Sequence, residues 1–454
     1  MKKNISKTLL ALALVFLVTN TYAGPFDEDE DIVATKDNTV KEETEKPTTA
    51  KVSILSTISS KVKEGISAVK NAKDKVVDNA SSQAADTEKT EKSTNKSNKK
   101  SFITESIFLP GHESKEMVCQ GIAYLPSKVM DANEQGDGSY CQYVLLSYYP
   151  KESKQPSQIL VVDRKTAKPV KRFSLYKKNG DAYTGHAGGI AVAGEYLWVA
   201  SGYKIHGFSV KEIIDFIGDT KKEAKAVKGL PKSMDELPAK KLTCIESYGV
   251  DSKASYVSFD GKYLWVGDFT KKSSKDYQPI AHHNAFKRNC WVAGYLVDQK
   301  GLPTSNTSYS LSIGDDTYKV NKPDAIIAMR ESVQGMAVCG DYVALTISFG
   351  ATNSKLAVYK NPLKDNGTKF TYKPAGQSKS FTVNSWELAD KKNWLNTKTI
   401  AAGAEDLEYD GDNLYLTFEC SSKNYNTKWR LANPLIKMTK DFYLIDVEKI
   451  ASEK

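Results

Sequence analysis

The residues of this sequence that could do chemistry stand at the starts of several similar stretches. His186 opens one stretch, and the carboxylates Glu405 and Asp406 open another far along the chain. A histidine beside a carboxylate can act as a general base with an orienting partner. The remaining stretches begin with the uncharged polar residues Gln120, Ser255 and Gln334. Such groups can also bind a polar ligand, or satisfy one another and bridging waters.

Other catalytic and metal-binding motifs do not occur in the sequence. It contains no G-x-S-x-G nucleophile elbow, no H-E-x-x-H zinc motif and no C-x-x-C pair. The adjacent His282 and His283 lie in DYQPIAHHNAFKRNC, which we interpret as a loop that could fold over one face as a lid. Two neighbouring histidines are too short a signal for a metal site. We therefore assign no metal ligands from the residues alone.

The elements that must position these residues recur along the second part of the chain. AGGIAVAGEYLWVAS (187–201) is echoed by ASYVSFDGKYLWVGD (254–268), VQGMAVCGDYVALTI (333–347) and AEDLEYDGDNLYLTF (404–418). In each copy a glycine and a charged residue precede an alternating strand, a pair typical of a tight hairpin turn with positive φ. Each copy is therefore predicted to be a strand, a turn and a second strand.

A fifth, looser copy begins at Gln120 and carries an insertion between its two strands. Third and fourth strands are predicted after the copies, which gives units of four strands over 101–454. Repeated four-strand units predict an all-β fold, a β-propeller with five blades. Six or seven blades are the alternative, if 211–243 or 361–400 hide degenerate units. The strand SFITESIFLPG, just before the first copy, is expected to complete the last blade and close the ring.

A propeller brings the opening residues of its inner strands together at one mouth of the central channel. The residues expected there are Gln120, His186, Ser255, Gln334, Glu405 and Asp406. We predict a ligand-binding site formed by the first five. His186, Glu405 and Asp406 are the candidates for catalysis, with the histidine as base and a carboxylate as its orienting partner.

The motif GHAGGIAV followed by GEYLWVAS, together with its repeats, resembles bacterial secreted β-propellers, loosely the gluconolactonase, strictosidine-synthase and NHL-repeat group. The resemblance covers 101–454. It implies either a binding scaffold or a calcium-dependent lactonase or esterase, whose calcium is held over the channel by Glu, Asp and Asn from different blades. At the corresponding strand starts of this sequence, Glu405 alone is a carboxylate.

We therefore predict a binding or interaction module whose partner is a small molecule, a glycan or a protein. The alternative is a metal-assisted hydrolase of the lactonase or esterase type at the same mouth, and calcium is the cofactor that this alternative implies. The net charge of +9 arises from basic residues interleaved with acidic ones. They are not clustered with aromatic residues, so a nucleic-acid partner is not expected.

The N-terminal part of the sequence predicts export. Residues 1–23 have a basic start, an apolar run and a Thr-Tyr-Ala cleavage site, which predicts a signal peptide cut after Ala23 and a secreted or periplasmic protein. Residues 24–100 are polar, charged and poor in aromatics, which predicts a disordered arm. Within it, an amphipathic helix over 51–79 could make weak contact with a membrane surface. Six cysteines in an exported protein predict at least one disulfide.

Overall fold

The computed structural model describes most of the chain beyond the N-terminal 100 residues, namely 101–109, 117–125, 143–151, 154–218 and 234–453. The predicted signal peptide, the arm and its helix over 51–79 lie outside the described residues. None of the helices in the described ranges has the length and apolar character needed to cross a bilayer.

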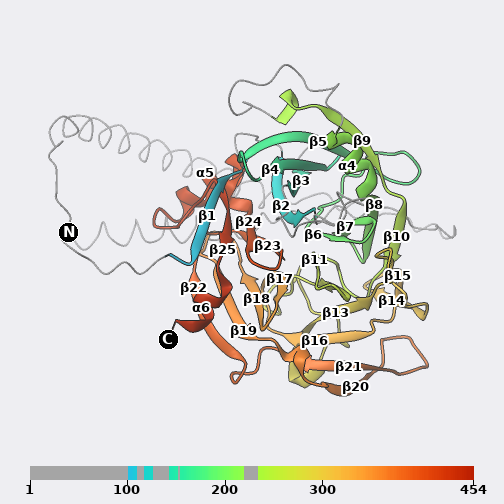
Figure 1. Cartoon of the computed structure of the whole chain (residues 1–454). Coiled ribbons are helices and arrows are strands. Elements are labelled where there is room, and N and C mark those ends of the chain that lie inside the picture. Colours follow the sequence, from blue (N-terminus) through green and yellow to red (C-terminus); the bar gives the residue numbers. More distant parts are fainter. Residues whose placement is uncertain (1–100, 110–116, 126–142, 152–153, 219–233, 454) are drawn as a thin grey trace, which may run out of the picture. The chain divides into compact units, whose positions relative to one another are not determined.

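Sheets of four or more strands form the blades of a β-propeller, so the predicted fold class is confirmed (Figure 1). The first blade contains β2 (Met117–Tyr124), β3 (Tyr143–Pro150), β4 (Gln158–Asp163) and β5 (Lys168–Tyr176). The second contains β6 (Ile190–Ala193), β7 (Tyr196–Ser201), β8 (Lys204–Ser209) and β10 (Glu246–Gly249). The third contains β11 (Tyr256–Phe259), β12 (Tyr263–Gly267), β13 (Cys290–Leu296) and β16 (Ala325–Met329).

The last two blades follow the same plan, and each sheet begins with its inner strand. The fourth contains β17 (Val333–Cys339), β18 (Tyr342–Ile347), β19 (Lys355–Lys360) and β22 (Trp394–Thr399). The fifth contains β23 (Ala404–Tyr409), β24 (Leu414–Phe418), β25 (Asp441–Ile445) and β1 (Ile103–Phe108). The hairpin glycines all have positive φ, as predicted; they are Gly194 (56°), Gly261 (90°), Gly340 (59°) and Gly411 (109°).

In the described parts of the long connections, the strands extend existing blades or form a separate hairpin and do not form further blades. β9 (Ala239–Thr243) pairs in parallel with β5, and β21 (Phe381–Glu387) pairs in parallel with β16. β20 (Thr368–Tyr372) pairs with β21, and β14 (Ser308–Ile313) forms a separate hairpin with β15 (Asp316–Asn321). The predicted number of five blades is therefore confirmed.

Short helices occupy several of the turns between strands. The α-helices are α4 (Val210–Gly218), α5 (Lys423–Ala432) and α6 (Val447–Ser452). The 3₁₀ turns are η2 (Met234–Glu236), η3 (Ala285–Lys287), η4 (Pro362–Lys364) and η5 (Glu419–Ser421).

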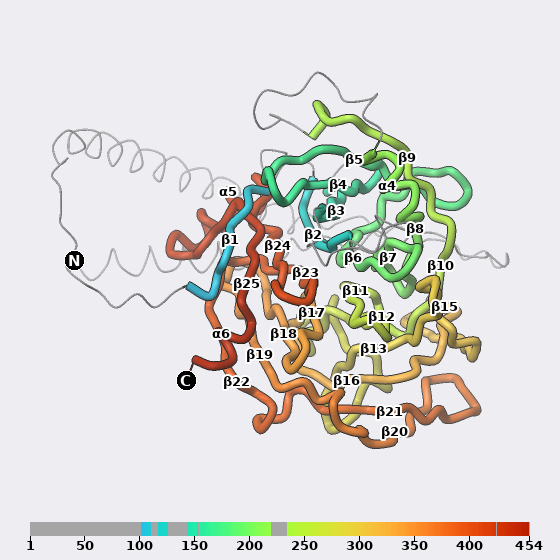
Figure 2. Tube along the Cα trace, viewed as in Figure 1, coloured from blue at the N-terminus to red at the C-terminus, as the bar shows by residue number. Residues whose placement is uncertain are grey.

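The ring is closed by the N-terminal strand of the domain. β1 pairs antiparallel with β25, from Ile103 opposite Ile445 to Phe108 opposite Asp441. In Figure 2 the blue trace of β1 runs beside the red trace of β25. The predicted closure is confirmed, and it leaves the fifth blade with an outer strand taken from the opposite end of the domain.

Each pair of neighbouring blades encloses its own hydrophobic core. Trp198 of the second blade packs with Val257 and Leu264 of the third, and its Nε1 donates a hydrogen bond to the Gly301 carbonyl at 3.0 Å. Trp265 of the third blade packs in the next core, between the third and fourth blades. The alternating strands thus bury one face against the blade before and the other against the blade after, as a closed ring requires.

The inner strands approach one another closely around the axis, and small residues make this approach feasible. A Cβ atom added to Gly189 would lie 2.7 Å from the Tyr256 Cα, and one added to Gly335 would lie 2.6 Å from the Glu405 carbonyl oxygen. Real Cβ atoms do not come so near to backbone. These two positions therefore exclude side chains, because a neighbouring inner strand passes there.

Hydroxyl groups on the second strands join neighbouring blades. The Ser147 hydroxyl accepts a hydrogen bond from the Gly121 N–H at 2.7 Å and donates one to the Ala187 carbonyl at 2.8 Å. In the same way the Thr346 hydroxyl donates to the Glu405 carbonyl at 2.5 Å. These bonds fix each inner strand relative to the next one.

The prediction of a disulfide is wrong for the cysteines that the structure describes. Cys119, Cys244, Cys290, Cys339 and Cys420 are buried and unpaired with one another, while Cys141 lies outside the described residues. Their thiols are used within the fold: Cys119 Sγ lies 3.0 Å from the Thr417 hydroxyl, for example. Burial raises the pKa of the Cys119 thiol to about 12, which makes its reactive thiolate form rare.

Replacing Gly189 by alanine tests the close approach of the inner strands. Because the added methyl group would meet the backbone of β11, we expect Gly189→Ala to lower the free energy of unfolding by about 2–4 kcal/mol. Gly218→Ala is the matched control, because a Cβ there meets nothing within 4 Å. Urea unfolding measures both, and equal stability of the two variants would contradict the close approach.

Ring closure predicts a specific energetic role for β1. Ile107 is 5% exposed and lies in the core between the fifth and first blades, so Ile107→Ala should destabilise the domain by about 2–4 kcal/mol. Glu105, an exposed residue of the same strand, is the control, and its alanine variant should change stability by less than about 1 kcal/mol. An Ile107→Ala protein as stable as the control would show that β1 contributes little to closure.

Candidate functional site

Asp406 is withdrawn from solvent and joins the inner strands of three blades. It lies on β23, and its Oδ2 accepts hydrogen bonds from the Ile122 N–H of β2 at 3.1 Å and the Ile190 N–H of β6 at 3.0 Å. Its other oxygen, Oδ1, faces Gly189. Burial raises the pKa of Asp406 well above its usual range, although the bonds from the backbone act in the opposite direction. This arrangement gives Asp406 a structural role, and its role in catalysis stays a prediction.

Glu405, the residue before it, lies beside a second acidic group, Glu419 of η5. Glu405 is 4% exposed, and its Oε1 accepts a hydrogen bond from Gln334 Nε2 at 3.5 Å. Burial raises the pKa of Glu405 well above its usual range, and the negative charges of Glu419 and Asp406 add to the effect. Two neighbouring carboxyl groups that are both poorly solvated cannot both ionise at low cost, so they titrate as a coupled pair.

Glu419 is the member of the pair that ionises more readily. Burial raises its pKa to about 7, while hydrogen bonds with Tyr425 and Gln120 and the positive charge of Lys151 limit the rise. Glu419 therefore gains or loses its proton near neutral pH, whereas a solvated glutamate does so only at more acidic pH. A group that can gain or lose a proton near pH 7 is suited to binding polar ligands and to proton transfer.

Two tyrosines border the carboxyl pair. The hydroxyl oxygens of Tyr149 and Tyr425 lie 3.3 Å apart, and Lys151 Nζ lies 3.9 Å from the centre of the Tyr425 ring. The mouth cluster, as we name it, consists of Gln120, Tyr149, Glu405, Glu419 and Tyr425. It combines two carboxyl groups, an amide and two phenol groups from five elements of the first and fifth blades.

His186 lies at the border of the mouth cluster. Its ring centre is 4.0 Å from that of Tyr149. Burial lowers the pKa of His186 to about 4, and the charge of Lys151 acts in the same direction, so the ring is neutral at pH 7. A neutral imidazole can accept a proton, but its pairing with Glu405 or Asp406 as a catalytic dyad stays a prediction.

The predicted site residues thus fall into two groups. Gln120, which is buried, interacts with Glu419, and Gln334 interacts with Glu405, so both belong to the surroundings of the carboxyl pair. Ser255 is engaged within the third blade, where its hydroxyl accepts a hydrogen bond from the Phe269 N–H at 2.9 Å. Ligand binding by these residues stays a prediction.

The sequence reasoning missed Tyr149, Glu419 and Tyr425. A usable signal was present for the first two, because each follows a hydroxyl residue of a second strand by two positions, Ser147 and Thr417 respectively. In a hairpin the end of the second strand lies beside the start of the first, so these residues must reach the same mouth. Tyr425 arrives from α5, which no repeat predicts.

His282 and His283 lie in the connection between β12 and β13, so the predicted loop is present, but it does not leave their side chains in solvent. Both side chains are buried, and both approach the buried carboxylate of Asp251. Atoms of these three residues that could bind a metal all lie within 4.8 Å of one another.

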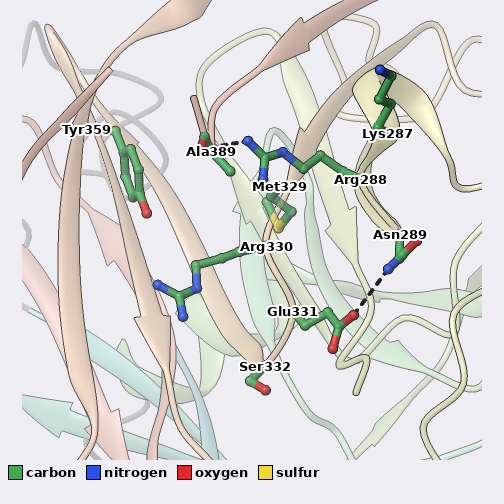
Figure 3. Close-up of a pocket in the computed structure, with 9 residues that line it drawn as sticks. All are labelled: Lys287, Arg288, Asn289, Met329, Arg330, Glu331, Ser332, Tyr359 and Ala389. Carbon is green, nitrogen blue, oxygen red and sulfur yellow. Dashed lines mark hydrogen bonds between the residues drawn. The ribbon is translucent and has the colours of Figure 1, made fainter. Parts of the chain in front are cut away.

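A pocket of about 570 Å³ lies elsewhere, between the third and fourth blades (Figure 3). Arg288 is neutralised there by Glu387, whose carboxylate lies 2.8 Å from its guanidinium, and it also donates to the Ala389 carbonyl at 3.0 Å. The lining contains three basic side chains and one acidic side chain, together with polar and apolar groups. The pocket is lined by Lys287, Arg288, Asn289, Met329, Arg330, Glu331, Ser332, Tyr359 and Ala389.

Comparisons with known proteins add little to this picture. No protein-family model matches the sequence, and no curated protein matches it. Among solved structures, the chain is similar to glutaminyl cyclase from Myxococcus xanthus, with a TM-score of 0.32, 8% identity, and coverage of 76% of this chain and 94% of that one. It is similar to BamB from Moraxella catarrhalis with a TM-score of 0.24, 8% identity, and coverage of 66% and 82%. The five-bladed fold rests on the strand pairing itself.

The raised pKa of Glu419 predicts how stability depends on pH. The native state holds this proton up to about pH 7, whereas a glutamate with the ordinary pKa of 4.5 releases it earlier. Since the native state binds the proton more tightly, its stability is highest below about pH 4.5 and falls as the pH rises to 7. Glu419→Gln should therefore be more stable than the wild type at pH 8, by on the order of 2 kcal/mol, and equally stable near pH 4. Urea unfolding between these pH values measures the difference, and a difference independent of pH would contradict the assignment.

Proposed function

We propose that the protein is a binding module, and that the mouth cluster holds the polar end of a small ligand. The observation that carries this proposal is the coupled pair Glu405 and Glu419, flanked by the hydroxyls of Tyr149 and Tyr425. Burying two carboxyl groups side by side destabilises the fold, and strongly perturbed acids of this kind concentrate at functional sites. The buried axis beneath the pair, which Asp406 occupies, supports binding at the mouth over passage through a channel.

The chemistry of the cluster restricts the ligand. A carboxyl pair that holds one proton offers both a hydrogen-bond donor and negatively charged acceptors. Amines, amides and sugar hydroxyls can use such a set, whereas a carboxylate or phosphate is repelled by it. The two tyrosine rings add apolar surface for the carbon skeleton of the ligand. We therefore propose a neutral or cationic polar ligand, and the earlier alternatives of a glycan or a protein partner would bind through a group of this kind.

A second candidate function is hydrolysis at the same place. The observation that favours it is the Glu419 pKa of about 7, which suits a general acid or base at neutral pH. The repeated blade sequences support membership of the gluconolactonase, strictosidine-synthase and NHL-repeat group. Calcium-dependent lactonase chemistry is part of this candidate function only if the protein belongs to that group. Export is proposed on the signal-like sequence of 1–23.

Calorimetric titration of the full chain at pH 7.5 tests the proposal, with amines, primary amides and monosaccharides as the probes. We expect saturable binding by at least one of these classes and none by simple carboxylates. Glu405→Gln and Glu419→Gln should each weaken this binding by 10-fold or more, because each leaves one carboxyl group where the ligand would contact two. Glu331→Gln, which changes the pocket in Figure 3, is the control and should bind normally.

Two results would decide against the proposal. Undiminished affinity in both mouth variants would place the ligand elsewhere. Turnover of a lactone or ester that Glu419→Gln abolishes, with unchanged substrate affinity, would favour the hydrolase over the binding module.

A further inference from the structure

We infer that Asp251, His282 and His283 form a binding site for a divalent transition-metal ion of the zinc type. Asp251 precedes β11, and the two histidines lie in the connection between β12 and β13. All three side chains are buried, with exposed fractions of 0%, 6% and 0%. The inference is independent of the function proposed for the mouth cluster.

The distances between the possible ligand atoms suit a shared metal ion. His282 Nε2 lies 2.9 Å from Asp251 Oδ2, and His283 Nε2 lies 3.4 Å from Asp251 Oδ1. Ligands at about 2.0–2.1 Å from a tetrahedral zinc ion are separated from one another by roughly 3.3 Å. Both separations from Asp251 are close to this value, and all three ligand atoms lie within 4.8 Å of one another, so modest side-chain shifts would let them surround an ion. Three protein ligands leave one position for water.

The position of the proton on the His283 ring gives a second, independent reason to expect a bound metal. If its Nε2 carried the proton and donated it to Asp251, its Nδ1 would be an acceptor. That Nδ1 is buried, makes no hydrogen bond, and faces another acceptor, Asp268 Oδ2, at 4.0 Å. Binding of a metal through Nε2 places the proton on Nδ1, where it points toward the Asp268 carboxylate. A histidine that is held between a metal and a carboxylate is the usual arrangement in metalloproteins.

Charge balance points the same way. Asp251 and Asp268 are both buried, and the ion-pair partners found for them among the described residues are these histidines. Ser252 donates one hydrogen bond to Asp268 at 2.8 Å. Two acids buried close together are costly, and a divalent cation would offset the charge of both.

The donor set selects the class of metal. Two imidazole nitrogens and one carboxylate oxygen suit zinc, cobalt or nickel, whereas calcium and magnesium require mainly oxygen ligands. The surroundings are apolar and aromatic: His283 stacks on Trp291 at 4.1 Å between ring centres, and His282 stacks on Tyr372 at 5.3 Å. Such walls keep competing water away from the ion.

The position of the site indicates a structural role. Tyr372 belongs to β20, and Tyr309, whose pKa is raised by burial and by the nearby charge of Asp251, belongs to the β14–β15 hairpin. Both elements are additions to the third blade, as is the segment that carries the histidines. An ion bound to Asp251 would therefore fasten this segment where the other additions meet.

The test uses the full chain without a histidine tag, stripped with a chelator and then titrated with Zn²⁺ alone. We expect about one zinc per chain by elemental analysis and a Tm that rises by several degrees on zinc addition. Co²⁺ in place of zinc should give the visible absorption bands of a four-coordinate nitrogen and oxygen site. This spectrum needs no variant, so it tests the inference even where a substitution prevents folding.

Variants assign the ligands. His282→Gln and Asp251→Asn should lower zinc affinity by at least 100-fold, while Asp268→Asn, which acts through His283, should lower it by about 10–100-fold. His206→Gln is the matched control, because it removes a histidine outside the cluster and should leave stoichiometry and affinity unchanged. Less than a tenth of an equivalent of zinc bound by the wild type, or equal loss in the control, would overturn the inference and leave a hydrogen-bonded triad.

Discussion

The close packing of the inner strands around the axis is the constraint on which the rest of the structure depends. Gly121, Gly189 and Gly335 allow backbone to meet backbone, and the one acidic side chain at the corresponding position, Asp406, fills the centre. Its carboxylate accepts N–H groups from β2 and β6, so a single residue of the fifth blade sets the register of the first and second. Because these registers are fixed, the starts of the inner strands meet at one end of the axis.

The contrast between Asp406 and its neighbour Glu405 explains how the same packing produces both a rigid scaffold and a candidate site. Asp406 is desolvated, yet one of its oxygens is satisfied by two backbone donors. Glu405 is equally desolvated, but it faces a second acid, Glu419, and a long contact with Gln334. In the first arrangement, the two hydrogen bonds to the desolvated Asp406 carboxylate make the inner strands rigid. The second leaves a pair of acids that retain a proton because of their burial and their proximity, which is a feature that a ligand can use.

Patterns with a local cause could be predicted from the sequence, and contacts set by tertiary packing could not. The hairpin glycines have a conformational reason for their positions, so the repeats, the five blades and the closure by β1 followed from them. No sequence pattern shows that β9 and β21 pair in parallel with the outer strands of two blades. Those blades already contain the four strands that the repeat predicts, so no partner is missing. Glu419 could have been placed at the mouth from its position two residues after Thr417. His282 and His283 do lie in a loop, but their polar neighbours in sequence gave no sign that Trp291 and Tyr372 would bury them.

The segment between β12 and β13 links the two polar clusters of the molecule. It begins at Asp268, which faces His283, and its middle carries Tyr277, whose pKa is raised by burial and by the charges of Glu419, Asp276 and Glu405. Tyr277 also packs edge-on against Phe269, with ring centres 5.0 Å apart. A tyrosine can affect the carboxyl pair only if its own segment is held in place. The interactions that bury His282 and His283 provide that support, so the insertions of the third blade contribute to the electrostatics of a site built by the first and fifth.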